Sequence, residues 1–288
     1  MAYSATNKEK IKYYKDKERY EFVKNEYLGL GKTNAQLAEE WDLPSSTVYN
    51  ILKYHGLIGT KLAEKITTSN EELFDIHNPI FCYMAGLISA DGYIDEKYHR
   101  VCLRMNVDAR KILERLRLYF RVSNPVAEYT TMTGFNGKDR NEPMYDLTIS
   151  SKKLLDELGK LNIHGRKKDL LVRFPDMSML SDECQEMYMR GLWDGDGTSR
   201  TTCTATDILE ESELMIDAIS NFLLNKLNIH CRYVPVRTYH SIRLSCKDGV
   251  VFYNWLYRHN LDCCIKYKYI NYINNTGCNW SLQDEEIV

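Results

Sequence analysis

The sequence lacks a long hydrophobic run and lacks the even, regularly spaced cysteines of a disulfide scaffold. No apolar stretch approaches the length that crosses a bilayer, and the first ten residues contain no apolar signal segment. We therefore expect no membrane partner and a cytoplasmic protein. The nine cysteines form no CxxC pair or Cys/His ladder, which argues against a zinc site and predicts reduced thiols.

The sequence also lacks an excess of positive charge. It has 38 Lys and Arg against 40 Asp and Glu, for a net charge of −2, whereas most simple DNA-binding domains are clearly basic. Net charge by itself thus argues against a nucleic-acid partner. It does not report how charge is distributed, and basic residues can still gather on one face. The 288 residues suffice for one large domain or for two to three small ones.

Residues 1–65 are predicted to form a small all-α domain. Lys8–Lys24 is rich in Lys, Glu and Tyr and is typical of a solvated helix. A second helix is expected after Thr33, which can cap it together with Gln36 three residues later. A third helix is expected over residues 45–55, after the break at Asp42-Leu43-Pro44. The arrangement resembles a helix-turn-helix module.

The third helix presents polar residues that suit contact with a DNA major groove. The outward-facing candidates are Ser46, Thr47, Tyr49, Asn50 and Lys53. The alternative is a small helical bundle used for packing or protein contact. Residues 66–74 are polar at their start and are expected to form a linker.

The remaining sequence contains an internal repeat of about a hundred residues. The first copy includes Tyr83–Gly92, the second includes Tyr188–Gly197, and the difference between positions 196 and 91 is 105 residues. Each copy then continues in the order strand, strand, helix, strand, strand, helix. The sequence therefore predicts two α-β-β-α-β-β-α units of the α+β class, over residues 75–180 and 181–288. The expected elements after the two leading helices are strands near 100–105 and 198–206, helices at 109–120 and 213–224, strands ending at 150 and 245, and helices at 153–161 and 250–258.

Both repeats begin with a nonapeptide that resembles LAGLIDADG, the motif of a family of homing endonucleases. The nonapeptides are Met84–Gly92 and Met189–Gly197, and the resemblance covers residues 75 to 275 because the downstream elements repeat as well. It implies a single chain with two motifs, whose pseudo-symmetric halves form a DNA-binding saddle. A single Asp-Gly pair is a common turn that ends a helix, but such turns do not explain two motifs in two repeats.

The residues of the motifs fit this resemblance physically. Gly86 and Gly191 lie in mid-helix, where each costs about 1 kcal/mol relative to Ala unless two helices approach closely there. Such a helix interface would bring Asp91 and Asp196 side by side. Two adjacent carboxylates repel each other, and Mg²⁺ (or Mn²⁺ in its place) relieves the repulsion because it prefers oxygen ligands.

In the family resembled, the second acid of each motif binds the catalytic metal with the carbonyl just before it. The resemblance therefore implies Asp91 and Asp196 as catalytic metal ligands, with the carbonyls of Ala90 and Gly195. Ser89 replaces the first acid in copy one, whereas copy two keeps Asp194; the resemblance gives this position a role in supporting the helix end. Arg190 replaces a small residue, so its side chain must point away from the helix pair.

The family often carries a basic residue after the last helix of each repeat. The resemblance matches Lys168 and Lys266 as catalytic candidates, with Lys167 and Lys268 as second choices. Ordinary surface lysines are the alternative.

The face of each sheet turned away from the helices is expected to contact double-stranded DNA. Its candidates alternate with apolar residues along the strands and are Arg100, Arg104, Arg237, Tyr239 and Arg243. A solvated face is the alternative for any single strand. The loop from Tyr129 to Glu142 could become ordered on DNA.

The sequence thus predicts a monomeric pseudo-dimer that cuts both strands of DNA at a long asymmetric site. The resemblance implies a gene of a mobile element, bacterial or phage-encoded, and a nucleoid-associated product. Two alternatives stay open. A helix-turn-helix joined to LAGLIDADG repeats also resembles the WhiA-type transcription regulators, which bind DNA without cutting it, and an RNA maturase would use the same saddle on a group I intron.

Overall fold

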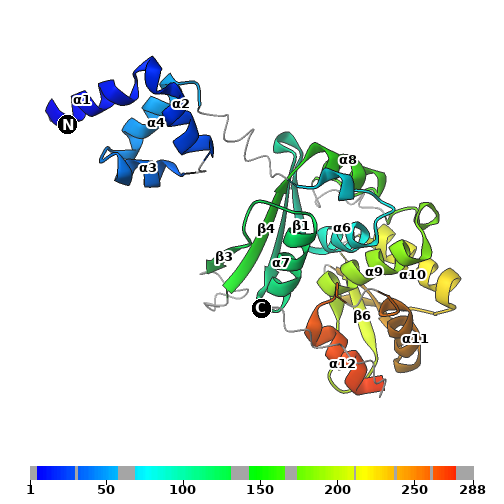
Figure 1. Cartoon of the computed structure of the whole chain (residues 1–288). Helices are drawn as coiled ribbons and strands as arrows, with labels where there is room; N and C mark the ends of the chain where they lie inside the picture. The colour runs from blue at the N-terminus through cyan, green and yellow to red at the C-terminus, as the bar shows by residue number, and fades with distance from the viewer. Residues whose placement is uncertain are drawn as a thin grey trace. The chain divides into compact units, whose positions relative to one another are not determined.

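The computed structural model describes residues 5–29, 32–57, 69–130, 143–165, 174–210, 212–236, 239–259 and 262–276. The chain divides into two compact units, Met1–Thr67 and Thr68–Val288, and each is described by itself. Figure 1 shows both units, with labels on most of their elements. Within the described part of the chain, no helix is long and apolar enough to cross a membrane.

The first unit is helical. The α-helices among its described residues are α1 (Ala5–Tyr14), α2 (Tyr20–Lys24), α3 (Asn34–Glu40) and α4 (Ser45–Tyr54). The predicted capping box is confirmed, because the Thr33 hydroxyl accepts from the Gln36 amide while the Gln36 side chain accepts from the Thr33 amide. The prediction of one continuous helix over residues 8–24 is wrong. The side chain of Asp16 accepts from the amide of Glu18 and starts a new short helix there.

This break has a packing consequence. After it, Val23 and Tyr27 turn inward and are buried with Leu37, Trp41 and the apolar side of α4. The unit therefore has its own hydrophobic core, separate from that of the second unit.

The second unit consists of two copies of the same element order, which confirms the predicted α+β class. Copy one contains α6 (Pro79–Asp91), β1 (Gly92–Asp95), β2 (Arg100–Asn106), α7 (Arg110–Tyr119), β3 (Ala127–Thr130), β4 (Pro143–Ser150) and α8 (Lys152–Lys160). Copy two contains α9 (Asp182–Asp196), β5 (Gly197–Thr198), β6 (Thr206–Glu210), α10 (Glu213–Leu227), β7 (Arg232–Val236), β8 (Tyr239–Leu244) and α11 (Cys246–Leu256), followed by α12 (Lys266–Thr276).

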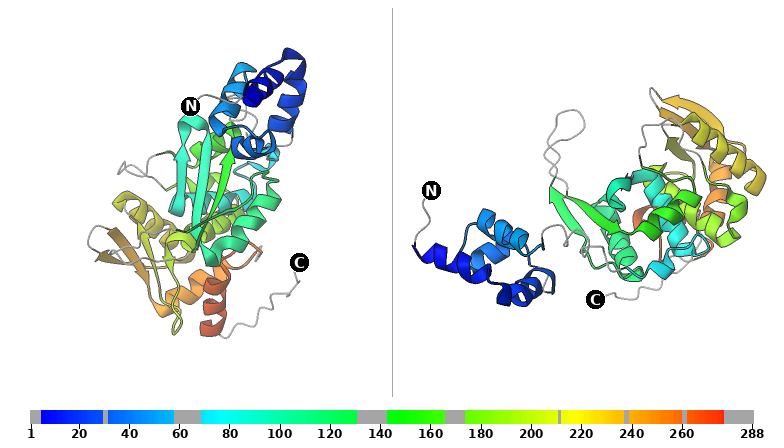
Figure 2. Two further views of the ribbon diagram at one scale, coloured as in Figure 1. Left: turned by 90° about the vertical axis from the view of Figure 1, so that its left-hand side faces the viewer. Right: turned by 90° about the horizontal axis from the view of Figure 1, so that it is seen from above.

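Each copy forms a four-stranded antiparallel sheet, with strand orders β1-β2-β4-β3 and β5-β6-β8-β7. One face of each sheet is buried, as the alternation of Val101, Leu103 and Met105 with exposed residues shows for β2. Helices α7 and α8 contact this face of the first sheet, and α10 and α11 contact that of the second. The two sheets lie on opposite sides of the paired helices α6 and α9 (Figures 1 and 2).

One predicted strand is shorter than expected. The strand predicted over residues 198–206 exists only at its ends, because the carbonyls of Arg200 and Cys203 accept from the Asn275 side chain of α12 instead of from a neighbouring strand. Strand β2 agrees with the expected strand near 100–105 to within one residue, and Val107, which follows it, is exposed. The strand ends at Asn106, whose side chain accepts from the amide of Asp108 and starts a helical turn.

Candidate active site at the helix pair

Helices α6 and α9 cross at backbone contact distance. An ideal Cβ at Gly86 would lie 2.1 Å from the carbonyl oxygen of Tyr188, and one at Gly191 would lie 2.0 Å from that of Tyr83. Any side chain at either glycine would push the helices apart. These are the mid-helix glycines that the sequence analysis assigned to a helix interface, and Tyr83 and Tyr188 are themselves 105 residues apart.

Both helices have a capped beginning. The side chain of Asn78 accepts from the amide of Ile80, with Pro79 in the first helical turn. The hydroxyl of Ser181 accepts from the amide of Cys184. These caps set where each of the two helices begins.

The motif acids meet at the opposite end of the helix pair. Helix α6 ends at Asp91 and α9 ends at Asp196. The Oδ2 atom of Asp91 lies 3.1 Å from the ideal Cβ position of Gly195, the residue just before Asp196. The two acids predicted as metal ligands therefore come from different repeats and converge on one place, together with the backbone of Ala90 and Gly195.

A second pair of contacts crosses the same interface with two-fold pseudo-symmetry. The hydroxyl of Tyr83 donates to Oδ2 of Asp194 at 2.7 Å, and the hydroxyl of Tyr188 lies 2.9 Å from the hydroxyl of Ser89. Each tyrosine thus reaches the first-acid position of the opposite motif. The substitution of Ser for an acid in copy one keeps the hydrogen bond and removes the charge.

Asp194 is a buried structural acid rather than a surface ligand. Its Oδ2 also accepts from the amide of Ile265 at 2.9 Å, while its Oδ1 has no hydrogen-bond partner among the described residues. Burial raises the pKa of Asp194, and the nearby ammonium of Lys268 and the bond from Tyr83 offset part of that rise. The carboxylate ties both motif helices to the segment that leads into α12.

Lys268 lies beneath the motif acids. Its side chain is buried, and its ammonium donates to the carbonyls of Trp193 (2.9 Å), Asp194 (2.7 Å) and Gly197 (2.6 Å). Burial lowers the pKa of Lys268 to about 8, against the attraction of Asp194, Asp196 and Asp91. An ammonium has three N–H donors, so these three carbonyls use all of them. Lys268 therefore holds the end of α9 in place.

In copy two, the second-choice lysine lies near the motif acids and the first-choice lysine does not. Lys266, the first choice in copy two, is exposed at the start of α12, and the second choice Lys268 is the lysine that reaches the acids. Lys266 and Lys268 are two residues apart on α12 and therefore point in different directions. Which of them faces the acids depends on where α12 begins, and the structure places that start at Lys266. Lys167 and Lys168 lie outside the described residues.

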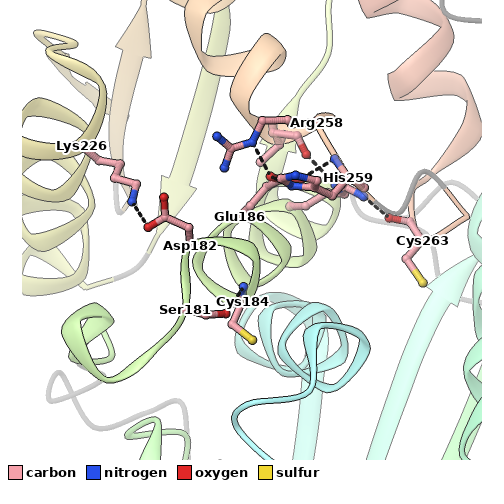
Figure 3. Close-up of polar contacts among 10 residues, drawn as sticks. Ser181, Asp182, Cys184, Glu186, Lys226, Arg258, His259 and Cys263 are labelled. Carbon is pink, nitrogen blue, oxygen red and sulfur yellow. Dashed lines mark hydrogen bonds and ion pairs between the residues drawn. The ribbon is translucent and has the colours of Figure 1, made fainter.

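Arg190, the departure from the motif in copy two, points away from α6 as expected. It is fully buried and donates to the carbonyls of Leu256, His259 and Cys263, while pairing with Glu186 at 2.6 Å. Figure 3 shows Glu186 also receiving contacts from the side chains of Arg258 and His259. This buried cluster fixes the chain between α11 and α12, and so indirectly positions Ile265 and Lys268.

The donor set at the ends of α6 and α9 fits a Mg²⁺ ion. Among the described residues, no group of three or more His, Cys, Asp or Glu side chains forms a complete metal cage. Mg²⁺ does not require one, because it keeps several waters and is commonly held by one or two carboxylates plus substrate phosphates. Asp91 and Asp196 supply two carboxylates, and Asp91 is exposed.

The outward face of the sheets carries several of the predicted DNA-contacting residues. Arg100, Arg104 and Tyr239 are exposed and Arg243 is partly exposed, while Arg237 lies outside the described residues. Most of the loop from Tyr129 to Glu142 also lies outside them, and only Tyr129 and Thr130 are described.

Two acids on this face, Asp146 and Asp207, were not among the residues predicted from the sequence. The carboxylate of Asp146 accepts hydrogen bonds from Nε and Nη2 of Arg104, at 2.8 and 2.7 Å. The carboxylate of Asp207 accepts hydrogen bonds from Arg243 and Arg200. Burial raises the pKa of Asp207, but the hydrogen bonds from these two arginines lower it by more than burial raises it, so that the net shift is downward. The available signal was an acid inside each strand segment, Asp146 in Pro143–Ser150 and Asp207 in Thr206–Glu210.

In the first unit, α4 exposes Ser46, Tyr49, Asn50 and Lys53. The assignment of Thr47 to the outward face is wrong, because Thr47 is 4% exposed. It lies beside Val48 on the side of α4 that covers the core, with Ile51 one helical turn later.

Comparison with solved structures identifies this architecture. The structure resembles the homing endonuclease I-WcaI bound to its DNA recognition sequence, with a TM-score of 0.51 and 17% identity over 68% of this chain and 87% of that chain. The chain has the LAGLIDADG fold. The homing endonuclease I-DmoI in complex with DNA and Mn has a TM-score of 0.43 and 16% identity over 63% of this chain and 98% of that chain.

The N-terminal LAGLIDADG domain of DUF199/WhiA also matches, with a TM-score of 0.43 and 17% identity over 62% of this chain and 80% of that chain. No family model and no curated protein matches this sequence. The LAGLIDADG assignment thus rests on the paired motifs, the repeated element order and the structural likeness.

Proposed function

We propose that the protein is a site-specific endonuclease that hydrolyses phosphodiesters in double-stranded DNA with Mg²⁺, for which Mn²⁺ can substitute. The observation that carries this proposal is the convergence of Asp91 and Asp196, one from each repeat, at the ends of helices in backbone contact. A fold that only bound DNA would have no physical need for two acids at this place. They repel each other and any phosphate unless a cation lies between them.

The chain's own residues divide the work as follows. Asp91 and Asp196 would hold the metal with the carbonyls of Ala90 and Gly195, and bound Mg²⁺ would supply an activated water and stabilise the leaving oxygen. Lys268 fixes the end of α9, so that Asp196 keeps its place beside Asp91. Because all three of its protons bond to carbonyls, Lys268 acts as a positioning residue and not as a proton donor.

The two sheets would orient the duplex as a saddle formed by one chain. Exposed arginines on the outward face provide phosphate and base-edge contacts. Because the two repeats differ in sequence, the two halves of the target would differ as well, giving a long asymmetric site. The DNA-bound homing endonuclease that this chain resembles supports a DNA substrate. A monomer is sufficient, since both acids lie on one chain.

The first unit would extend the DNA contact through α4. Its exposed side chains Ser46, Tyr49, Asn50 and Lys53 combine hydroxyl, amide and cationic groups on one side of a helix, as major-groove contacts require. The separate core of this unit allows it to act as an independent module.

The test is cleavage, with Mg²⁺, of the genomic DNA that flanks the gene of this protein. The wild type is compared with Asp91→Asn and Asp196→Asn. We expect metal-dependent cutting that both substitutions abolish while DNA binding in Ca²⁺ persists. Asp182→Asn is the matched control, because Asp182 lies on the same helix as Asp196 but at its other end, where it pairs with Lys226 (Figure 3).

Tight DNA binding without cutting in Mg²⁺ or Mn²⁺ would contradict the proposal in favour of a DNA-binding regulator. Preferential binding to intron RNA over the DNA duplex would instead favour a maturase.

A further inference from the structure

The outward face of each sheet holds an arginine against a carboxylate in a bidentate contact. In the first sheet, Nε and Nη2 of Arg104 donate to the two oxygens of Asp146 at 2.8 and 2.7 Å. In the second, Nε and Nη2 of Arg243 donate to the two oxygens of Asp207 at 2.5 and 3.3 Å. Both are cross-strand neighbours in the ladder, Arg104 opposite Asp146 and Asp207 opposite Arg243.

In both pairs the acid is buried and the arginine is exposed. The side chains of Asp146 and Asp207 are 4% and 10% exposed, against 53% for Arg104 and 42% for Arg243. The buried carboxylate thus lies behind the exposed arginine and binds the Nε edge of its guanidinium. The other edge, with Nη1 and the second proton of Nη2, faces outward. Tyr129 adds a ring 5.2 Å from Cζ of Arg104.

The two pairs are not copies of one inherited pair. Gly92 pairs with Leu103 and Gly197 pairs with Ile208, so these positions are equivalent in the two repeats. Arg104 follows Leu103, whereas Asp207 precedes Ile208, and the acid and the arginine have exchanged strands. The same arrangement therefore occurs at different rungs, which points to a use for the arrangement itself.

An acid is unfavourable on a surface that must approach phosphates, so its presence needs a reason. An arginine held at its Nε edge has lost most of its rotamer freedom and presents a fixed two-donor edge. The O6 and N7 atoms of guanine form the matching pair of acceptors in the major groove, and a bidentate contact of this kind is worth about 1–3 kcal/mol of discrimination. A freely moving arginine would serve a phosphate equally well, without a buried carboxylate behind it.

We propose that Arg104 and Arg243 each recognise a guanine in opposite halves of the target, with Asp146 and Asp207 as the positioning residues that aim them. The inference rests on the proposed DNA-binding function of the sheets. It assigns specificity to two arginines out of the many cations on the chain and gives the two acids a role in target choice.

The test selects binding sites from a library of randomised DNA duplexes, in Ca²⁺ so that no strand is cut, with the full-length protein. The wild type should select a consensus with a guanine in each half. Arg104→Gln should lose the guanine at one position and keep the rest of the consensus, with binding to the wild-type site weaker by about 5- to 150-fold. Arg243→Gln should do the same in the other half.

Asp146→Asn should weaken the same guanine preference that Arg104→Gln removes, and the double variant should be no worse than Arg104→Gln alone, because the acid acts through the arginine. Arg100→Gln is the matched control on the same strand, since Arg100 has one 3.3 Å contact to Asp95 and no bidentate clamp. It should lower binding to all sequences alike and leave the consensus unchanged.

Two results would overturn the inference, and they are distinguishable. If Arg104→Gln and Arg243→Gln lower binding to every sequence equally, the arginines contact phosphates and the guanine assignment is wrong while DNA binding stands. If the wild type enriches no duplex from the library, the proposed DNA-binding function fails and the assignment fails with it. Thermal unfolding of each variant, with midpoints close to that of the wild type, excludes a folding defect as the cause.

Discussion

Lys268 is the residue whose contribution to the site follows most directly from its hydrogen bonds. Replacing it with Met would remove a buried donor that bonds to three carbonyls at the end of α9. We expect Lys268→Met to lower the free energy of unfolding by about 3 kcal/mol or more, measured by denaturant unfolding. Lys266→Met is the control, since Lys266 is exposed and should change stability by less than about 0.5 kcal/mol. Equal effects of the two substitutions would contradict this role.

Asp194 should make stability depend on pH in the acidic range. Burial raises the pKa of Asp194 above its ordinary value of 3.8, so the folded state keeps this proton to a higher pH than the unfolded state does. The resulting stabilisation is fully present below pH 3.8 and is lost as the pH rises through the raised pKa. In Asp194→Asn this dependence should be absent.

The measurement is the difference in free energy of unfolding between the wild type and Asp194→Asn, from about pH 3 to about pH 7. The wild type should lose stability relative to the variant as the pH increases. A difference that is flat, or that grows in favour of the wild type, would show that the carboxyl is not held protonated by burial.

At this scale, the sequence identifies residues whose role depends on type and spacing alone. Asp91, Asp196 and the two helical glycines follow from the repeated motif. The choice between Lys266 and Lys268 does not, because it depends on where α12 begins, and the burial of Thr47 depends on the rotation of α4 against a core that the sequence does not display.

Among the elements, the crossing of α6 and α9 should tolerate no added side chain. In Gly86→Ala, the new methyl group would lie 2.1 Å from the carbonyl oxygen of Tyr188, and both atoms belong to rigid helices. We expect a loss of several kcal/mol, on the order of 3 or more, and loss of DNA cutting, because Asp91 and Asp196 would separate. Denaturant unfolding and the cleavage assay measure the two effects.

Gly159→Ala provides a matched comparison within helix α8. An added Cβ there meets only His164 Cε1, at 3.6 Å, which is an ordinary contact. Since Ala is the better helix former, this substitution should raise stability by about 0.5–1 kcal/mol. If Gly86→Ala were as harmless as Gly159→Ala, the close crossing would be wrong.

The order of elements could be predicted because each copy repeats the same alternation of period and length. The interruptions within the predicted elements could not be predicted. Neither the break near Asp16 nor the gap between β5 and β6 has a strong local signal. Each depends on a specific hydrogen bond, from the amide of Glu18 in one case and from the distant side chain of Asn275 in the other.

For the whole molecule, removal of the first unit should separate binding from cutting. The first unit has its own core, and both motif acids lie in the second. A protein that begins at residue 69 should keep the unfolding transition of the larger unit and its metal-dependent cutting. Its DNA affinity should fall, with a shallower dependence on salt, because fewer phosphates are contacted.

Titrations of the same duplex at several salt concentrations, with full-length and shortened protein, check this expectation. Unchanged affinity and salt dependence would show that the first unit does not contact DNA. The variants Asn50→Ala and Lys53→Ala in the full-length chain should reproduce part of the loss.

Net charge was the least informative whole-molecule property. The value of −2 argued against DNA, yet part of the acidic count lies under the arginines of the sheet face, where Asp146 and Asp207 hold cations outward. A count of charged residues treats such an acid as unfavourable for DNA binding, whereas in the structure the acid pairs with an arginine and holds it in place. The pairing of each acid with its arginine follows from the strand register, which composition does not contain.

The unequal tyrosine contacts across the helix pair show what joining two halves in one chain permits. Tyr83 bonds to an acid and Tyr188 bonds to the hydroxyl of Ser89. In a dimer of identical subunits, any substitution at this position would occur twice and both cross-contacts would change together. Here the two halves can differ at this position, so one half can carry a buried acid and the other a hydroxyl, and each half can have its own base preference.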